Sequence, residues 1–451
     1  MALSRPNIVL MVADDHGLDT GAHGNPSIET PHLDRLAREG VRFTNAFCTT
    51  ASCAASRSVI LTGQYNHANG TYGHTHGCHH FSCFDQVLTL PRLLREAGYR
   101  TARVGKQHYA PESLFPFEQG CPAGQFGRDD VRMSEACRDF VKREGRPFFL
   151  YWCSMNPHRG GGVLPENPCK PDRFGNPSED FPGDRERIFC EDEVRVPSYL
   201  PDSPETRAEL AQYYQSVARL DRGIGRLLQI LQDEGVYDDT VILYISDNGP
   251  AFHGAKTTLY EPGMNLPLVV KYPLCPRNNA TCDGLVTWAD ITPTILDLAG
   301  ALEDPGRFHG ASFVEIMGKE SPADWRQEVY AAHTFHEITN YYPMRVVRTH
   351  RYKLIWNIAH GLTYSSASDL WESATWQGTL RSGSGRYGAR TLEAYLHRPR
   401  FELYDLKEDP LERVNLAFDQ EHAGLVEEFC ARIRAFQEKT RDPWLHKWEY
   451  E

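Results

Sequence analysis

Two pairs of side chains with oxygen ligands each follow a short apolar run in this sequence. Asp14 and Asp15 come directly after one run, and Asp247 and Asn248 come after another. Oxygen-only ligands suit hard divalent cations, and Ca²⁺ more than Mg²⁺ where several carboxylates crowd one ion. Either pair alone is typical of an ordinary turn or helix cap. Both pairs at the ends of apolar runs predict a calcium site.

A cysteine and an arginine stand one turn apart at the start of a short helical pattern. Cys53 opens that pattern, and Arg57 follows on its second turn. Taken alone, Cys53 is most simply a buried thiol and Arg57 an ion-paired side chain. Beside the oxygen ligands, Cys53 is a candidate nucleophile and a further metal ligand. The N-terminus of the helix would add backbone N–H groups that favour anions.

Two further apolar runs are also followed by polar side chains. Lys106 and His108 come after one of them, and Asn156 and His158 come after the other. Ligands of open α/β sheets bind outside the carboxyl ends of the strands. Polar residues at four such ends therefore predict one shared cleft. Imidazole suits acid and base steps there, because its pKa lies near neutrality.

The elements that would position these residues alternate between strands and helices. Four apolar runs are typical of strands buried on both faces, as in a parallel sheet: Ile8 to Ala13, Pro147 to Trp152, Thr240 to Ile245 and Leu268 to Lys271. Helical spacing follows Thr30 as far as Gly40, and a longer helix is predicted between Ser203 and Glu234. This alternation indicates an α/β fold with a large, mostly parallel sheet.

The pattern changes near residue 330, which predicts two parts of unequal size. Residues 1–330 would form the catalytic α/β domain, and residues 331–451 a smaller α+β subdomain packed on it. The smaller part is predicted to contain two strands and a turn within Met344 to Asn357, a strand at Phe401 to Asp405 and a closing helix at Gln420 to Lys439. Residues 156–200, rich in Pro and Gly, are predicted to form a cleft wall or lid.

Composition excludes some classes of partner. The 451 residues are 41% hydrophobic and 24% charged, as in ordinary globular enzymes, and carry a net charge of −12. This charge argues against a nucleic-acid or anionic-membrane binder, although a local cationic pocket can still hold an anion. Because the sequence shows neither a signal peptide nor a membrane-length apolar run, we expect a soluble, cytoplasmic protein whose twelve cysteines are mostly reduced.

A cluster of histidines and cysteines leaves two interpretations open. Its members are His74, His76, Cys78, His79, His80 and Cys83. These residue types are zinc ligands, but their spacing fits no common structural zinc pattern. The favoured alternative is a wall of the substrate cleft that faces a sugar.

Several segments resemble the type I sulfatases, in which a cysteine is oxidised to formylglycine. One segment, Cys53-Ala54-Ala55-Ser56-Arg57 with Leu61-Thr62-Gly63, resembles the sulfatase signature. Sulfatases usually have proline where Ala55 stands. Further sulfatase-like segments are Pro6-Asn7-Ile8-Val9, Thr30-Pro31-His32-Leu33-Asp34, Phe43-Thr44-Asn45-Ala46, Gly105-Lys106, Asn156-Pro157-His158, Ser246-Asp247-Asn248-Gly249 and Glu402-Leu403-Tyr404-Asp405-Leu406. Because the match covers nearly the whole chain, the resemblance implies the alkaline-phosphatase-like fold.

Other segments resemble one subfamily, the heparan N-sulfatases or sulfamidases, more than the rest. They are His79-His80-Phe81, Phe84-Asp85, Pro197-Ser198-Tyr199-Leu200-Pro201, Glu209-Leu210-Ala211, Leu259-Tyr260-Glu261-Pro262-Gly263, His336-Glu337-Ile338-Thr339 and Tyr342-Pro343-Met344-Arg345. Two positions depart from that subfamily. Lys256 stands where sulfamidases tend to carry arginine, and Asn156 replaces an aspartate expected beside the substrate.

The resemblance implies a hydrolase whose nucleophile is formylglycine, made from Cys53 by a formylglycine-generating enzyme. Its one calcium ion would be held by Asp14, Asp15, residue 53, Asp247 and Asn248. One hydroxyl of hydrated formylglycine would attack sulfur while the ion and three cations stabilise the sulfate oxygens. These cations are Arg57, Lys106 and Lys256. His158 would protonate the leaving group, and His108 would take a proton as sulfate leaves.

The implied reaction is removal of an N-sulfate or O-sulfate from a sugar, by a chain whose relatives suggest a homodimer. Two alternatives stay open. An arylsulfatase-like enzyme or a phosphonate monoester hydrolase would use the same core. If Cys53 is not modified, the chain would be a sulfoglycan-binding protein without activity.

Overall fold

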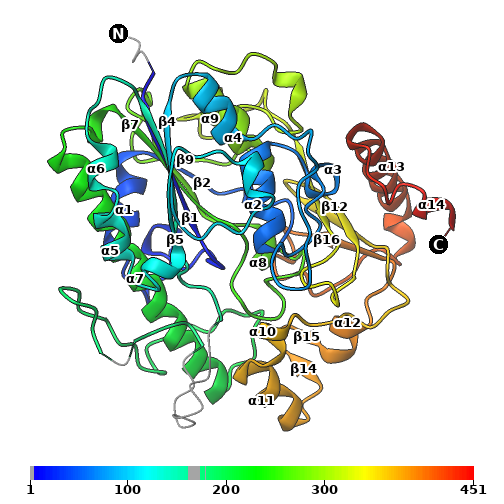
Figure 1. The fold of residues 1–451 in the computed structure, drawn as a ribbon. Helices are drawn as coiled ribbons and strands as arrows, with labels where there is room; N and C mark the ends of the chain where they lie inside the picture. The colour runs from blue at the N-terminus through cyan, green and yellow to red at the C-terminus, as the bar shows by residue number, and fades with distance from the viewer. Residues whose placement is uncertain (1–4, 161–172, 178, 451) are drawn as a thin grey trace.

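A central eight-stranded sheet organises the larger part of the molecule (Figure 1). The computed structural model describes residues 5–160, 173–177 and 179–450. The strand order is β5-β4-β6-β1-β7-β8-β2-β9. Their bounds are β1 Asn7–Ala13, β2 Val41–Phe43, β4 Arg100–Gly105, β5 Gln119–Pro122, β6 Phe148–Cys153, β7 Thr240–Ser246, β8 Leu268–Lys271 and β9 Ala280–Cys282. The first five strands in this order run parallel, and β2 and β9 share their direction.

Strand β8 is the exception to the parallel prediction. It pairs antiparallel with both β7 and β2. A fully apolar run indicates a strand that is buried on both faces of the sheet, and such burial does not depend on the direction of the strand. The sequence therefore predicted the strand correctly and its direction wrongly.

Strand β1 shows why its apolar run is unbroken. Alternate side chains of a strand point to opposite faces. Ile8 and Leu10 accordingly enter one buried cluster, and Val9 and Met11 enter another. Because helices cover both faces, each side chain is buried whichever way it points.

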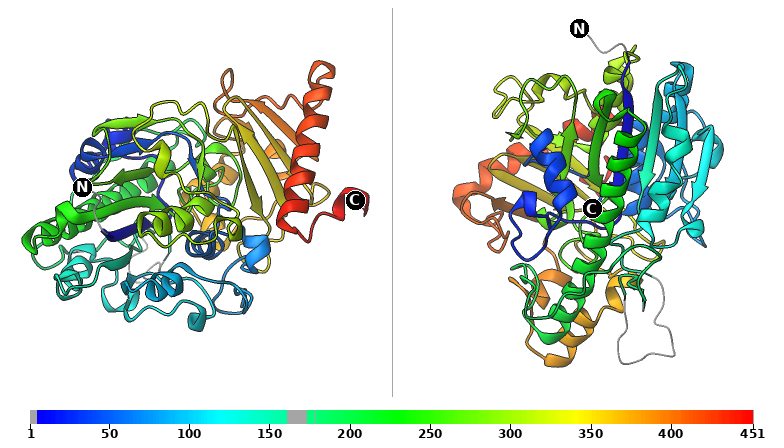
Figure 2. Two further views of the ribbon diagram at one scale, coloured as in Figure 1. Left: turned by 90° about the horizontal axis from the view of Figure 1, so that it is seen from above. Right: turned by 90° about the vertical axis from the view of Figure 1, so that its left-hand side faces the viewer.

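The helices form one layer on each face of the sheet (Figures 1 and 2). The layer that packs on Val9 and Met11 contains α1 (Pro31–Glu39), α5 (Asp130–Glu135), α6 (Arg138–Val141) and much of α7 (Pro204–Asp233). The opposite layer contains α2 (Cys53–Thr62), α4 (Leu90–Glu96) and α9 (Ile291–Leu298). The predicted helices after Thr30 and Ser203 are confirmed as α1 and α7.

A second, antiparallel sheet lies beside the first, toward the C-terminus (Figure 2). It contains β11 (Glu328–His333), β12 (Met344–Thr349), β13 (Tyr352–Asn357) and β16 (Phe401–Asp405), in that order. Helix α13 (Ala423–Thr440) packs on it through Phe429 and Ile433. The strands and helix predicted after residue 331 are thus confirmed, while the division at residue 330 stays a prediction.

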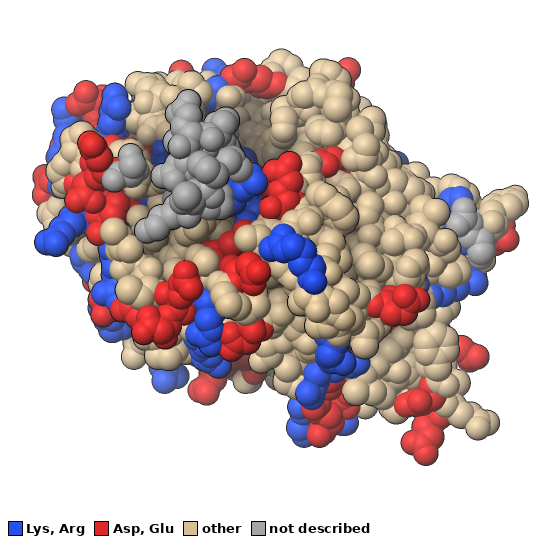
Figure 3. Space-filling model, turned by 90° about the horizontal axis from the view of Figure 1, so that it is seen from below, with Lys and Arg blue, Asp and Glu red and all other residues tan. Residues whose placement is uncertain are grey.

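The long segment predicted as a cleft wall is only partly described, because residues 161–172 and 178 lie outside the described residues. Its described parts contain no helix or strand. No helix among the described residues has the length and apolarity needed to cross a bilayer. On the face drawn in Figure 3, Lys and Arg side chains are interspersed with Asp and Glu.

Candidate active site

The two oxygen-ligand pairs meet because β1 and β7 are parallel neighbours. Ala13 lies opposite Ser246 in the register, so the residues that follow each strand emerge side by side. The backbone N–H of Asp15 donates to Asp247 Oδ1 at 3.1 Å, and Asn248 Nδ2 donates to Asp15 Oδ1 at 2.7 Å. All four predicted oxygen ligands, Asp14 included, are fully buried. The structure therefore brings the predicted oxygen ligands into one group.

Cys53 joins this group from the N-terminus of α2. Its Sγ lies 3.6 Å from Asp15 Oδ1. Burial raises the pKa of the Cys53 thiol well above its usual range, despite the nearby lysines. Because the thiolate is the nucleophilic form, the unmodified cysteine is a weak nucleophile here at neutral pH. Nucleophilic attack by residue 53 therefore calls for a covalently modified side chain in place of the thiol.

Each carboxylate has its own cation. Arg57 Nε donates to Asp247 Oδ2 at 2.8 Å, Lys256 Nζ donates to Asp15 Oδ2 at 3.0 Å, and Lys106 is paired with Asp14. Burial alone would raise the pKa of Asp14 and Asp15. The lysines and His158 outweigh it, so both pKa values lie below the ordinary range. These two carboxylates are therefore anionic at neutral pH.

Asp247 differs from the other two. Burial raises its pKa from 3.8 to about 7, against the lowering effect of Arg57 and with Asp14 adding repulsion. Two buried oxygens of the group, Asp14 Oδ1 and Asn248 Oδ1, have no hydrogen-bond partner among the described residues. A divalent cation held by these oxygens would satisfy both atoms and stabilise ionised Asp247. The donor set therefore fits a hard cation.

The raised pKa of Asp247 predicts a pH dependence of stability in chelator-treated protein. Between pH 4 and 7 the folded state retains a proton on Asp247 that the unfolded state has lost, so rising pH lowers the free energy of unfolding. Measured by urea unfolding relative to Asp247→Asn, the wild type should lose up to about 1.4 kcal/mol per pH unit in this window.

Two controls complete that comparison. Asp238→Asn removes an exposed carboxylate near the other end of β7 and should leave the wild-type slope unchanged. Addition of a divalent cation should reverse the trend, because a bound cation favours the ionised carboxylate. If the free energy of unfolding had the same pH dependence in wild type and in Asp247→Asn, the raised pKa of Asp247 would be contradicted.

A cavity of about 620 Å³ opens next to the carboxylates. Four of the predicted catalytic residues line it, namely Lys106, His108, His158 and Lys256. His158 Nδ1 lies 2.6 Å from Asp15 Oδ2. Burial, together with Lys106, lowers the pKa of His158, against the raising effect of Asp14. The cavity thus presents two lysines and two imidazoles to a bound anion.

The cluster of six histidines and cysteines does not form one site. His74 and His76 line the cavity, whereas the other four members are not among its lining residues. Cys83 is buried and its sulfur contacts the Thr71 hydroxyl, while Cys78 and His80 are exposed. Of the six, only His74 and His76 are among the described residues that line the cavity.

Three further lining residues come from two segments for which no site residue was predicted, and one of these is the sulfamidase-like segment that begins at His336. They are Glu337, Ser368 and Asp369. Asp369 Oδ2 accepts a hydrogen bond from Lys256 Nζ at 2.7 Å, so Lys256 is shared between two carboxylates. The Ser-Asp-Leu-Trp segment around Asp369 carries no recognisable motif, and no sequence signal identified it.

Asn156 lies elsewhere than expected. It is fully buried, its Nδ2 donates to Asp130 Oδ2 at 2.9 Å, and its Oδ1 accepts from the Ser216 hydroxyl at 3.0 Å. It is not among the described residues that line the cavity. Asn156 therefore stands apart from the described cavity lining, because neighbouring polar groups hold its amide inside the protein.

Two family patterns and several known proteins are similar to this chain. The sequence pattern of the sulfatase family matches residues 6–301, and the pattern described as "N-sulphoglucosamine sulphohydrolase, C-terminal" matches residues 252–372. Human N-sulphoglucosamine sulphohydrolase is 37% identical over 98% of this chain and 92% of its own length. An ulvan-active sulfatase of Formosa agariphila is 27% identical over 97% of this chain and 81% of its own length.

Solved structures share the fold. BT4656, in complex with D-glucosamine-2-N,6-O-disulfate, superposes with a TM-score of 0.70 at 23% identity and covers 97% of this chain and 99% of its own. The phosphonate monoester hydrolase of Agrobacterium radiobacter gives a TM-score of 0.68 at 19% identity, with 97% and 96% covered. The alkaline-phosphatase-like fold is thus confirmed. With a family pattern over most of the sequence and a close relative along nearly all of it, this chain belongs to the sulfatase family.

Proposed function

We propose that this sulfatase removes the N-sulfate of a glucosamine unit, using formylglycine derived from Cys53 and one bound Ca²⁺. The observation that carries the proposal is the 37% identity with human N-sulphoglucosamine sulphohydrolase along 98% of the chain. The site supports it, since Cys53 lies within 3.6 Å of a metal-ligand candidate and beside a cavity lined by cations.

Two groups would complete the site. Hydrated formylglycine would supply the nucleophilic hydroxyl, and Ca²⁺, held by Asp14, Asp15, Asp247 and Asn248, would supply Lewis acidity. The oxygen-only donor set supports calcium over zinc at this position.

The three cations have distinct places around an entering sulfate. Lys106 and Lys256 line the cavity, so their ammonium groups can donate to sulfate oxygens as charge develops there. Arg57 is fully buried and not among the lining residues, and its Nε donates to Asp247 Oδ2, which orients that carboxyl group. The lysines therefore bind the reacting group, while Arg57 orients a metal ligand.

The two histidines would move protons. In the imidazolium form that Asp14 and Asp15 favour, His158 would keep its Nδ1–H on Asp15 and give its Nε2 proton to the departing amine. His108 Nε2 lies 3.0 Å from His76 Nδ1, and its own Nδ1 has no partner among the described residues. His108 is thus placed to accept a proton when sulfate leaves.

A comparison of three substrates tests the proposed specificity. N-sulfated glucosamine should give the highest kcat/KM, ahead of an aryl sulfate and a phosphonate monoester. Faster turnover of the aryl sulfate or the phosphonate would overturn the substrate assignment and favour the same core with another activity. Calcium removal by a chelator should abolish turnover, and Ca²⁺ should restore it better than Mg²⁺.

The state of residue 53 separates the enzyme from an inactive binding protein. A formylglycine-generating enzyme is the proposed partner, and it must accept Ala55 where sulfatases usually have proline. Mass spectrometry of the peptide carrying Cys53, from protein made in its own host, should show the aldehyde. A wholly unmodified thiol, with sulfate binding but no turnover, would instead support the sulfoglycan-binding alternative.

Asp369 should matter because it shares Lys256 with Asp15. In Asp369→Asn the ammonium loses one anionic partner, so its position over the cavity is less defined. We expect kcat/KM to fall about ten-fold, the low end for residues that orient a site group. Glu372→Gln, which removes a nearby exposed carboxylate paired with Arg173, is the matched control and should keep full activity. Equal activity of the two variants would contradict a role for Asp369.

Two expectations from the sequence stay predictions. A homodimer would be recognised by light scattering coupled to size-exclusion chromatography. A cytoplasmic location would be recognised by fractionation of the native host.

A further inference from the structure

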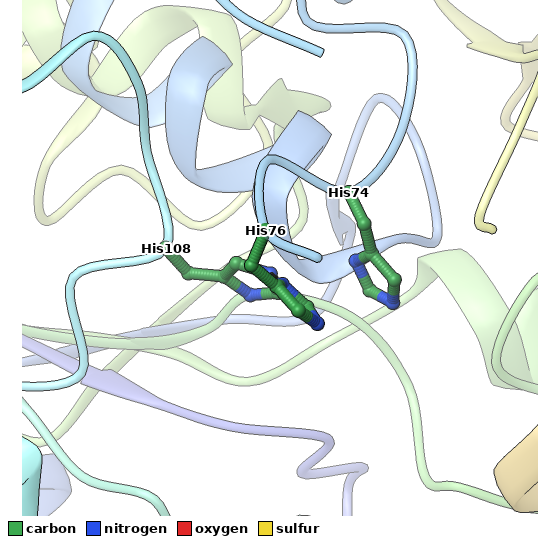
Figure 4. A group of neighbouring side chains, drawn as sticks. All are labelled: His74, His76 and His108. Carbon is green, nitrogen blue, oxygen red and sulfur yellow. Dashed lines mark hydrogen bonds between the residues drawn. The ribbon is translucent and has the colours of Figure 1, made fainter. Parts of the chain in front are cut away.

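Three imidazoles converge at the mouth of the cavity (Figure 4). His74 and His76 come from the loop after α3 (Asn66–Asn69), and His108 follows β4. Their ring centroids are 4.8–4.9 Å apart in all three pairings. One ligand atom from each ring lies within 4.8 Å of the others. Residues over thirty positions apart are thus gathered into one triangle.

The nitrogens of this triangle are available as ligands. His76 Nδ1 and His108 Nε2 share a hydrogen bond of 3.0 Å, close to the separation of about 3.3 Å that two imidazole nitrogens adopt on one tetrahedral zinc ion, which would take the place of the shared proton. His74 Nδ1 is buried without a hydrogen-bond partner among the described residues. Burial and nearby cations lower the pKa of all three rings, which are therefore neutral at pH 7.

The surrounding charge does not exclude a cation. Lys106 and Lys256 lie on the same cavity, but each is paired with a buried carboxylate. Glu337 lines the cavity as well and adds negative charge on its wall, whereas Glu112, another lining residue, is paired with Arg103. Water in the cavity can supply a fourth ligand, as in zinc sites with three protein ligands and one open position.

We propose that His74, His76 and His108 form a second metal site, for a borderline transition-metal ion of the Zn²⁺ class. It is distinct from the oxygen-ligand site, because imidazole nitrogens suit zinc and carboxylate oxygens suit calcium. The exposed His76 can close the triangle by moving its side chain, since one of its ring nitrogens already faces His108.

Occupation of this site has a consequence for turnover, which rests on the proposed function. A metal bound to Nε2 of His108 takes the lone pair that would accept a proton. The ion would also stand in the cavity where substrate enters. Zinc is therefore expected to inhibit the enzyme reversibly, and a zinc-selective chelator added in the presence of excess Ca²⁺ should restore activity.

Calorimetric titration of Zn²⁺ into the full chain, with the oxygen-ligand site saturated by Ca²⁺, tests the site itself. One equivalent should bind, and Co²⁺ in its place should give the intense visible absorption of a tetrahedral or five-coordinate nitrogen site. The same titration with Cys53→Ser should give the same affinity. Because this variant has no formylglycine, the result stands whether or not the proposed function is correct.

Variants identify the ligands. His76→Gln, at an exposed position, should weaken zinc binding at least ten-fold, and His74→Gln should do the same. His80→Asn and Cys78→Ser are matched controls in the same loop and should keep wild-type affinity; asparagine tolerates the positive φ of His80. Unchanged affinity in both His74→Gln and His76→Gln, or loss of binding in Cys78→Ser, would overturn the proposal.

Inhibition provides the second measurement. The zinc concentration that halves kcat/KM should match the calorimetric Kd and should rise at least ten-fold in His76→Gln. Zinc binding without inhibition would overturn the link to His108 while leaving the metal site in place. Absence of turnover with any substrate would count against the proposed function alone, because calorimetry decides the site independently.

Discussion

Replacement of Cys53 by alanine is expected to lower turnover of an N-sulfated glucosamine by at least about four orders of magnitude, as loss of a catalytic nucleophile does in other hydrolases. Residue 53 is the only part of the group near Asp15 that oxidation can turn into a hydroxyl-bearing nucleophile. The carboxylates, lysines and histidines would all remain. Turnover is measured by release of inorganic sulfate from Ca²⁺-saturated protein.

A second buried thiol provides the control for that loss. Cys48→Ala removes a fully buried sulfur that contacts the Gly263 carbonyl, away from the cavity. It should reduce stability about as much as Cys53→Ala but keep most of the activity. Retention of activity in Cys53→Ala, or equal loss in both variants, would contradict nucleophilic catalysis at residue 53.

Substitution of Lys106 by methionine is expected to lower kcat about 10²- to 10³-fold, the cost of removing one preorganised donor to developing negative charge. Methionine retains much of the length of the side chain but loses its charge. Lys106 lines the cavity and is paired with Asp14, so the change removes a proposed sulfate ligand and also leaves Asp14 without its main cation. The fall should appear mainly in kcat if the ammonium acts on the transition state.

The matched control for Lys106 is another buried lysine. Lys271→Met removes an ammonium at the end of β8 that donates to the Tyr237 carbonyl, and Lys271 is not among the residues that line the cavity. It should leave kcat within about two-fold of wild type, because the substitution alters the structure outside the cavity. A fall confined to KM in Lys106→Met would mean that this lysine binds substrate without stabilising the transition state.

The core of the site was visible in the sequence because its residues follow strands directly. Asp14 and Asp15 come immediately after β1, and Asp247 and Asn248 after β7. Strand ends are local features, since an apolar run and the polar residue after it are adjacent in the chain. Parallel pairing of β1 with β7 then brings the two ends together without further information.

Strand direction and side-chain partners could not be predicted in that way. The apolar run of β8 gives burial but no direction, and Asn156 gives a polar residue but not the buried partners that hold it away from the cavity. Both depend on which segments pack beside them. A single sequence reports periodicity, whereas packing depends on residues far away in the chain.

The sequence by itself determined the two oxygen-ligand pairs, the spacing of Cys53 and Arg57, and the α/β fold that positions them. Each of these features depends on residues that are close together in the chain. Only the tertiary structure decided that Lys256 is shared with Asp369, 113 positions away, and that His74 and His76 stand beside His108. It also decided that Asp247 has a raised pKa, because burial is a property of the folded protein. Charges and lone pairs removed from water must find partners among whatever the fold places nearby, and that is decided in three dimensions.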